Sequence, residues 1–244
     1  MAAAHVYPVR SGSAVKFLVC HPGPQFSVHD VFVGWVEALR GAGQDVVLFN
    51  LNDRLTFYDN TYFNIREGVF RKAIQGETAI ELAVNGLYAT LYKTRPDVLL
   101  VVSAFLVPAD LLDLARRYGT KVVILHTESP YEDERQLGQA EHADLNLLND
   151  PVNLERFTAV APSLYMPHAY RETLHKPGPR DPAAASDFAF VGTGFESRMA
   201  FFEAMDLDGI DVALAGNWQR LTDDSPLRKY VAHNLNECCD NTEA

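Results

Sequence analysis

A regular alternation of short apolar runs with longer stretches of helical periodicity constrains the fold of this chain more than any other feature. Residues 15–20 are apolar and end at a His-Pro-Gly-Pro turn, and residues 28–39 then place apolar side chains at helical spacing. Because unbroken apolar runs indicate strands buried on both faces, the pattern predicts a doubly wound parallel α/β sheet covered by helices. Further strands are expected at residues 45–50, 98–103, 121–126, 145–148 and 164–166, and helices at about 77–93 and 111–118.

The overall charge excludes general binding to nucleic acid or to anionic membranes. Lys and Arg total 21 against 32 Asp and Glu, which gives a formal net charge of -11. The longest apolar run, residues 98–107, is too short for a bilayer span of roughly 20 residues. Three cysteines, Cys20, Cys238 and Cys239, form neither a disulfide framework nor a metal quartet. We therefore expect a soluble, cytoplasmic protein without a bound metal.

A change of composition and a loss of periodicity between residues 168 and 186 predict a second domain. This stretch is rich in Pro, Ala and charge and lacks periodicity, as is typical of a linker. A strand at 187–191, a helix at about 197–205 and a strand at 212–215 then start a new βαβ unit. We expect a flexible tail at 1–14, an N-terminal domain at 15–170, a linker at 171–186 and a partial second domain at 187–244. Two strands make no covered sheet, so a fragment of a longer protein is favoured over a remnant domain packed on the first.

The strongest local signal is the segment FVGTGFESR, in which a strand runs through a glycine turn into a helix. Free backbone N–H groups and the helix dipole at such a turn form an anion site. Arg198 in the first helical turn opposes the dipole, and its fork of N–H groups matches phosphate. Gly192, Thr193, Gly194 and Arg198 are therefore predicted to bind phosphate. The alternative is a plain glycine turn with Arg198 paired to a glutamate of the same helix.

The next strand of this unit ends in Gly216-Asn217-Trp218. Adjacent parallel strands would bring this end beside the Gly192 turn, where the indole of Trp218 could stack on a base and Asn217 could hydrogen-bond to the ligand. The alternative, which the sequence favours for Trp218, is an anchor in the core.

In the first domain, candidate residues follow the strands, where parallel sheets bind ligands. His21 ends the first strand, and His29 and Asp30 begin the helix after it. A histidine with an ordinary pKa near ~6.5 suits a general base, and an acidic neighbour would orient it. The alternative for Asp30 is a helix-capping box with Ser27.

His126 and Glu128 stand in the same way at the end of the fourth strand. The residues after them, Ser129, Pro130 and Glu132, have the pattern of a capping box with proline at the first helical position. We therefore keep only His126 and Glu128 as candidates for chemistry in this segment.

Several of these segments together are familiar. HPGPQFS, HTESPYED, LLND, LYMPHAY, DFAFVGTGFESR and ALAGNW resemble the bacterial and phage glycosyltransferases of the spore-maturation CgeB-like group, over nearly the whole chain from about residue 15. The resemblance implies a GT-B architecture, in which two Rossmann-like domains face each other across a cleft. It also implies that the first domain takes the acceptor and that the second, incomplete here, takes a nucleotide-diphosphate sugar. The implied diphosphate contacts are Gly192, Thr193, Gly194 and Arg198, and the implied nucleoside contacts are Gly216, Asn217 and Trp218.

The expected activity is transfer of a sugar from a nucleotide-diphosphate sugar to an acceptor hydroxyl, without a metal and with no cofactor beyond the donor. Asp30 or His29 would accept the acceptor proton if the reaction inverts, and Glu128 would shape the acceptor side together with His21 and His126. The chain stops where members of the resembled group continue through a Glu-containing segment. The alternative is a non-catalytic, two-lobed module that binds a nucleotide or another anion.

Overall fold

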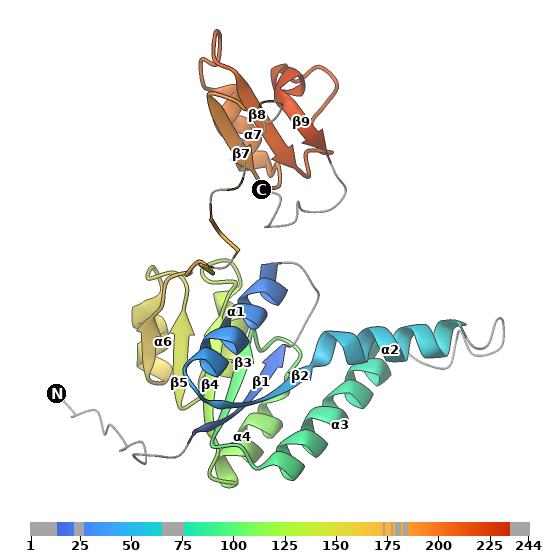
Figure 1. The fold of residues 1–244 in the computed structure, drawn as a ribbon, viewed down its shortest axis with the longest axis vertical. Helices are drawn as coiled ribbons and strands as arrows, with labels where there is room; N and C mark the ends of the chain where they lie inside the picture. Colours follow the sequence, from blue (N-terminus) through green and yellow to red (C-terminus); the bar gives the residue numbers. More distant parts are fainter. Residues whose placement is uncertain are drawn as a thin grey trace. The chain divides into compact units, whose positions relative to one another are not determined.

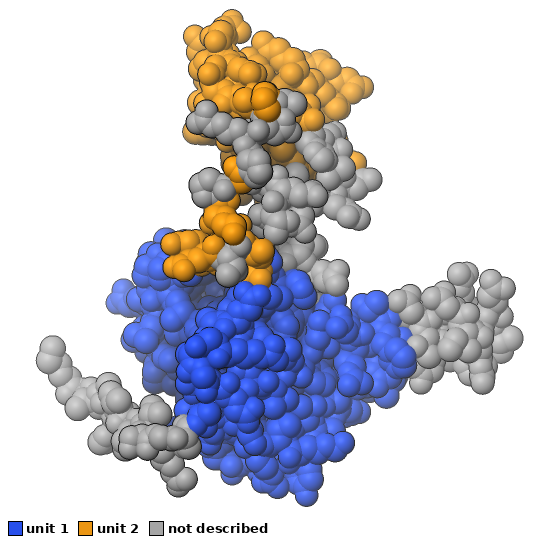
Figure 2. All heavy atoms as spheres, in the orientation of Figure 1, with its two compact units in different colours: residues 1–169 blue, residues 170–244 orange. Residues whose placement is uncertain are grey.

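The computed structural model (Figure 1) describes residues 14–21, 27–64, 76–172, 174–176, 178, 182 and 185–234. The expected tail lies outside this set except for Ala14, as do the Pro-Gly-Pro of the first turn, part of the expected linker, and Cys238 and Cys239. The chain divides into two compact units, residues 1–169 and 170–244 (Figure 2).

The apolar runs of unit 1 form one six-stranded sheet, and every neighbouring pair in it is parallel, as predicted. The strand order is β2-β1-β3-β4-β5-β6, so the chain changes direction across the sheet between β1 and β3 (Figure 1). Ligands of such sheets bind beyond the carboxyl ends of the strands at this switch point. The strands are β1 (Lys16–His21), β2 (Asp45–Asn50), β3 (Val98–Val102), β4 (Lys121–His126), β5 (Leu145–Leu148) and β6 (Ser163–Tyr165).

Helices cover both faces of this sheet because neighbouring strand residues point to opposite sides. Leu18 and Leu99 face the core beneath α2, α3 and α4, whereas Val19 and Leu100 face the core beneath α1. Among the helices of the described residues, none is long and apolar enough to cross a membrane. The helices of unit 1 are α1 (Ser27–Gly41), α2 (Leu51–Asn64), α3 (Gly76–Thr94), α4 (Ala109–Arg117), α5 (Asp133–Ala140) and α6 (Leu154–Val160).

Unit 2 is a smaller parallel sheet of order β7-β8-β9. The expected strand, helix and strand appear as β7 (Phe188–Val191), α7 (Glu196–Glu203) and β8 (Val212–Gly216). The expectation of only two strands is wrong, because a 3₁₀ helix, η2 (Pro226–Tyr230), leads into a third strand, β9 (Val231–Asn234). The core of the unit gathers around Phe202, Leu214 and Trp218.

Candidate functional site

The turn between β7 and α7 is held by its own backbone N–H groups. Gly192 donates to the carbonyl of Ala215 over 2.9 Å, and Gly194 donates to the carbonyl of Asn217 over 2.8 Å. Both acceptors belong to the end of β8 or the residues after it, so these bonds fasten the turn to the neighbouring strand. The expectation that Gly192 and Gly194 offer free amides to an anion is therefore corrected.

Three other N–H groups of the turn make no hydrogen bond within the described part of the chain: those of Thr193, Glu196 and Ser197. The N-cap residue of α7, Phe195, gives no side-chain cap. A helix start with open N–H groups carries partial positive charge and attracts anions. Of the residues that the glycine pattern indicated, Thr193 keeps an open N–H group, and the other two open N–H groups, those of Glu196 and Ser197, lie in the first turn of α7.

Arg198 is held over the same turn. Its Nη1 donates to the carbonyl of Thr193 over 2.9 Å, and its guanidinium carbon lies 5.4 Å from the ring centre of Phe190 and 5.1 Å from that of Phe195. Within the described residues Arg198 forms no ion pair. Glu203 instead accepts a hydrogen bond from the hydroxyl of Ser225, the N-cap residue of η2. The predicted alternative, Arg198 paired to a glutamate, is therefore not what the structure contains. A guanidinium has five N–H groups, and most of them remain for a ligand.

The glycines have packing reasons of their own. A Cβ at Gly194 would lie 2.5 Å from a ring carbon of Trp218, and a Cβ at Gly216 would lie 2.5 Å from the carbonyl oxygen of Gly192. Gly216 also has a φ of +108°, which L side chains rarely adopt. Close approach of the two turns thus requires glycine at these positions whether or not a ligand binds.

Trp218 is an anchor of this packing and not a stacking surface. Its exposed fraction is 0%, its Nε1 donates to the carbonyl of Ala215 over 3.0 Å, and its ring centre lies 6.0 Å from that of Phe190. The core anchor that the sequence favours for Trp218 is therefore confirmed, and the other prediction, a base stacked on Trp218, is corrected, because the indole is fully buried. Asn217 is half-buried beside it, and its Oδ1 accepts from the N–H of Gln219 over 3.3 Å.

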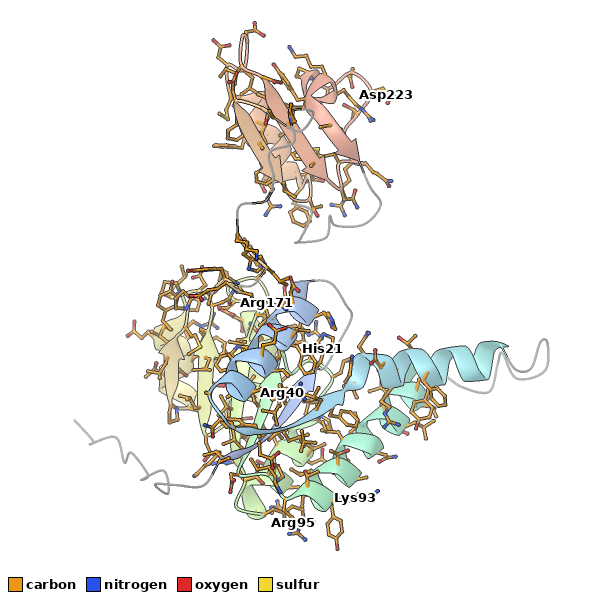
Figure 3. All side chains as sticks on the ribbon, in the orientation of Figure 1. His21, Arg40, Lys93, Arg95, Arg171 and Asp223 are labelled. Carbon is orange, nitrogen blue, oxygen red and sulfur yellow. The ribbon has the colours of Figure 1, made fainter. Side chains whose placement is uncertain are left out.

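In unit 1, His21 ends β1 (Figure 3), and the ring of a second histidine of α1 lies against it. The ring centres of His21 and His29 lie 5.5 Å apart, and the ring of Phe32 lies 5.2 Å from His21. Neither ring nitrogen of His21 nor Nδ1 of His29 has a hydrogen-bond partner within the described residues. Burial, and then the neighbouring His29, lower the pKa of His21, while Asn50 and Asp53 oppose this.

His126 is equally enclosed. Its Nε2 lies 2.8 Å from Oδ1 of Asn146 on β5, its ring lies 4.9 Å from that of Phe157, and burial lowers its pKa. The exposed fractions of His21 and His126 are 0% and 1%. Their expected place on the acceptor side is corrected, because neither ring has an exposed atom to offer. His29, Asp30 and Glu128 are half-buried and stay candidates.

The loop after β4 differs from its predicted capping box. The helix α5 begins at Asp133 and not at Pro130, its N-cap Glu132 gives no side-chain cap, and Ser129 Oγ donates to Asp133 Oδ2 over 3.2 Å. The carboxylate of Asp133 is buried and also accepts from Gln136 over 2.9 Å and from Asn153 over 2.6 Å. No sequence pattern marks Asp133 for this role, since one of its three partners, Asn153, lies twenty positions away.

The buried histidines predict a loss of stability in mild acid. Because burial lowers the pKa of His21 and His126 in the folded state, the unfolded chain binds protons first, below about pH 6.5. The stabilising effect of the neutral rings is complete above that pH and is lost as the pH falls toward the folded pKa, at up to about 1.4 kcal/mol per pH unit for each ring. Urea unfolding between pH 5 and 8 should show the slope, and His126→Gln should reduce it. His168→Gln is the exposed control and should leave the dependence of the unfolding free energy on pH unchanged. If His126→Gln leaves that dependence unchanged too, the buried His126 ring is not its cause.

Within the described residues, no three His, Cys, Asp or Glu side chains lie close enough together to hold a metal ion.

Comparison with known proteins gives the fold. No protein-family model and no curated protein matches the chain. A putative UDP-N-acetylglucosamine 2-epimerase from Listeria monocytogenes superposes with a TM-score of 0.56 and 14% identity, over 95% of this chain and 71% of that one. The fold is GT-B-like. The likeness shows no more than the fold, and the finer CgeB-like assignment stays a prediction.

Two further solved structures are similar at lower scores. A Glycyrrhiza uralensis UGT complexed with glycyrrhetinic acid 3-O-monoglucuronide has a TM-score of 0.49 and 10% identity, over 90% of this chain and 65% of its own. MurG of Acinetobacter baumannii has a TM-score of 0.48 and 12% identity, over 93% of this chain and 68% of its own. The chain thus spans less than two thirds of the UGT's length.

Proposed function

We propose that unit 2 binds a nucleotide-diphosphate sugar and that the protein transfers the sugar to an acceptor hydroxyl held by unit 1. One observation carries the proposal: Arg198, without an acidic partner in the described residues, is fixed by Thr193 at the uncapped start of α7. The GT-B-like fold supports it, since the epimerase that superposes on the chain is named for a UDP-sugar.

The chemistry of the turn suits a diphosphate leaving group. Negative charge develops on the diphosphate as the bond to the sugar breaks, and fixed N–H groups together with a guanidinium stabilise it. In our proposal the N–H groups of Thr193, Glu196 and Ser197 and the free edge of the Arg198 fork share this role. On the acceptor side, Asp30 or His29 would accept the hydroxyl proton if the reaction inverts, and Glu128 would bind the acceptor.

Calorimetry with UDP, GDP and ADP tests the donor site. Arg198→Ala should weaken binding of the preferred diphosphate about ten- to hundredfold, because charge-assisted hydrogen bonds contribute about 1.5–3 kcal/mol each. Arg220→Ala is the control, since Arg220 is an exposed cation of the same unit. An unchanged affinity in folded Arg198→Ala, or no diphosphate bound by the unmodified chain, would remove the assignment.

Release of free nucleoside diphosphate from a panel of sugar donors then separates transfer from binding. Turnover that depends on an added hydroxyl acceptor supports the transferase. Binding that persists without turnover supports the alternative, a module that holds a nucleotide without catalysis.

A further inference from the structure

The loop between β4 and α5 carries an aromatic side chain that neither the core nor the proposed donor site uses. Tyr131 has an exposed fraction of 88%, the highest among the exposed large apolar side chains of the described residues. The loop follows the carboxyl end of β4, which is the edge where parallel sheets bind ligands. An isolated exposed tyrosine is ordinary, so the surroundings of Tyr131 decide what it means.

The backbone beneath Tyr131 is fixed. Its N–H donates to the carbonyl of Glu128 over 2.8 Å, and the buried Asp133 two positions later accepts hydrogen bonds from Ser129 and Asn153. These bonds tie the loop to α5 and to the loop after β5. The ring is therefore presented to solvent from a preorganised segment, and a ligand would lose little free energy in ordering that segment.

A second aromatic ring stands at the end of the neighbouring strand. Phe105 follows β3, and the guanidinium carbon of Arg135 lies 4.4 Å from its ring centre. Arg135 Nη1 also lies 3.6 Å from a carboxylate oxygen of Glu132, the residue next to Tyr131. Phe105, Arg135 of α5 and Glu132 thus lie together, and Glu128 and Tyr131 belong to the same loop as Glu132. We call these five residues the β3–β4 edge patch.

We propose that the β3–β4 edge patch binds a carbohydrate, and that the acceptor of the transfer reaction is a glycan. A sugar ring has an apolar C–H face that packs on an aromatic ring such as Tyr131. Its hydroxyls can donate to the carboxylates of Glu128 and Glu132 and accept from the guanidinium of Arg135. The acceptor role rests on the proposed function, whereas carbohydrate binding does not.

The charges of the patch favour a glycan over other partners. Tyrosine and arginine are also frequent in protein interfaces, but glutamates are depleted there, and two of them border Tyr131. Phosphate backbones of nucleic acids are repelled by these carboxylates and by a chain of net charge -11. A neutral polyhydroxyl ligand can pack on the aromatic ring, donate to the carboxylates and accept from the guanidinium.

A printed glycan array covering α- and β-linked gluco-, galacto-, manno- and N-acetylated oligosaccharides, with calorimetry on the best binder, tests this in the full chain. Tyr131→Ala should weaken binding at least tenfold, and Tyr131→Phe should preserve it because the ring remains. Tyr92→Ala is the matched control: Tyr92 is 59% exposed in the last turns of α3, and the guanidinium of Arg95 lies 4.8 Å from its ring. Arg95 (Figure 3) precedes β3, so this pair lies by the amino end of that strand, whereas Phe105 follows its carboxyl end.

No glycan bound on the array, or equal affinity in Tyr131→Ala, would overturn the inference, as would an equal loss in Tyr92→Ala. Binding of a protein fraction without any glycan would assign the patch to a protein partner and overturn it too. Diphosphate binding is measured in parallel on the same samples. Glycan binding without diphosphate binding would remove the proposed donor site and leave the patch standing.

Discussion

Trp218→Ala is expected to lower the free energy of unfolding of unit 2 by about 3–5 kcal/mol. The indole is fully buried, packs against Phe190 and Phe202 and fills the space above Gly194, where even a Cβ would not fit. Its removal leaves a cavity and takes away the hydrogen bond to Ala215. Since small domains are stable by about 5–15 kcal/mol, this single change removes a large share of the stability.

Urea unfolding followed by circular dichroism measures the effect, because the replacement also removes a fluorescent probe. Phe201→Ala is the control on the same unit: Phe201 is 63% exposed on α7, so its loss should change the free energy by less than about 0.5 kcal/mol. If Trp218→Ala unfolds at the same urea concentration as the unmodified chain, the role of Trp218 as anchor is wrong.

The strands of unit 1 were predictable because their apolar runs are local signals. Residues 45–50, 121–126 and 145–148 were predicted with the bounds that β2, β4 and β5 have. A parallel strand buried on both faces needs apolar residues at nearly every position, so its composition alone reveals it. β9 (Val231–Asn234) lacks that signal, since it is short, mixes polar with apolar residues and follows directly on a 3₁₀ turn.

The site was predictable only where its chemistry is local. Arg198 and Thr193 are five positions apart, and the sequence placed both at the turn between β7 and α7. The amide of Gly194, by contrast, is used by the carbonyl of Asn217, twenty-three positions further on. A hydrogen bond over that separation depends on how β7 and β8 align, and no pattern of neighbouring residues reports it.

The same reasoning explains why the predicted capping box of Ser129 and Glu132 does not form. The spacing of these residues fits a capping box, but the serine hydroxyl donates its hydrogen bond to the buried carboxylate of Asp133, four positions further on. A carboxylate in a buried position needs several donors, and here they come from this loop, from α5 and from the loop after β5. The hydrogen bonds to this carboxylate therefore stabilise the fold more than a helix cap would, since a cap contributes about 1 kcal/mol.

Asp133→Ala is accordingly expected to lower the free energy of unfolding of unit 1 by about 2–6 kcal/mol. The hydroxyl of Ser129 and the amide of Gln136 are buried, and each would lose its acceptor at about 1–3 kcal/mol. The loop after β5 would also lose the bond from Asn153, the shortest of the three at 2.6 Å. Urea unfolding at pH 7 measures the change.

Glu134→Ala is the matched control, since Glu134 is the next residue of α5 and its side chain is 83% exposed. Its ion pair with Arg156 lies at the surface, where such pairs contribute about 0–1 kcal/mol. Asp133→Asn should lower the free energy of unfolding by an amount between those of the two alanine variants. The asparagine amide keeps one acceptor oxygen, but its NH2 group replaces the second oxygen and faces donors that it cannot accept from. A loss for Asp133→Ala no larger than for Glu134→Ala would show that the three hydrogen bonds do not hold the loop that presents Tyr131.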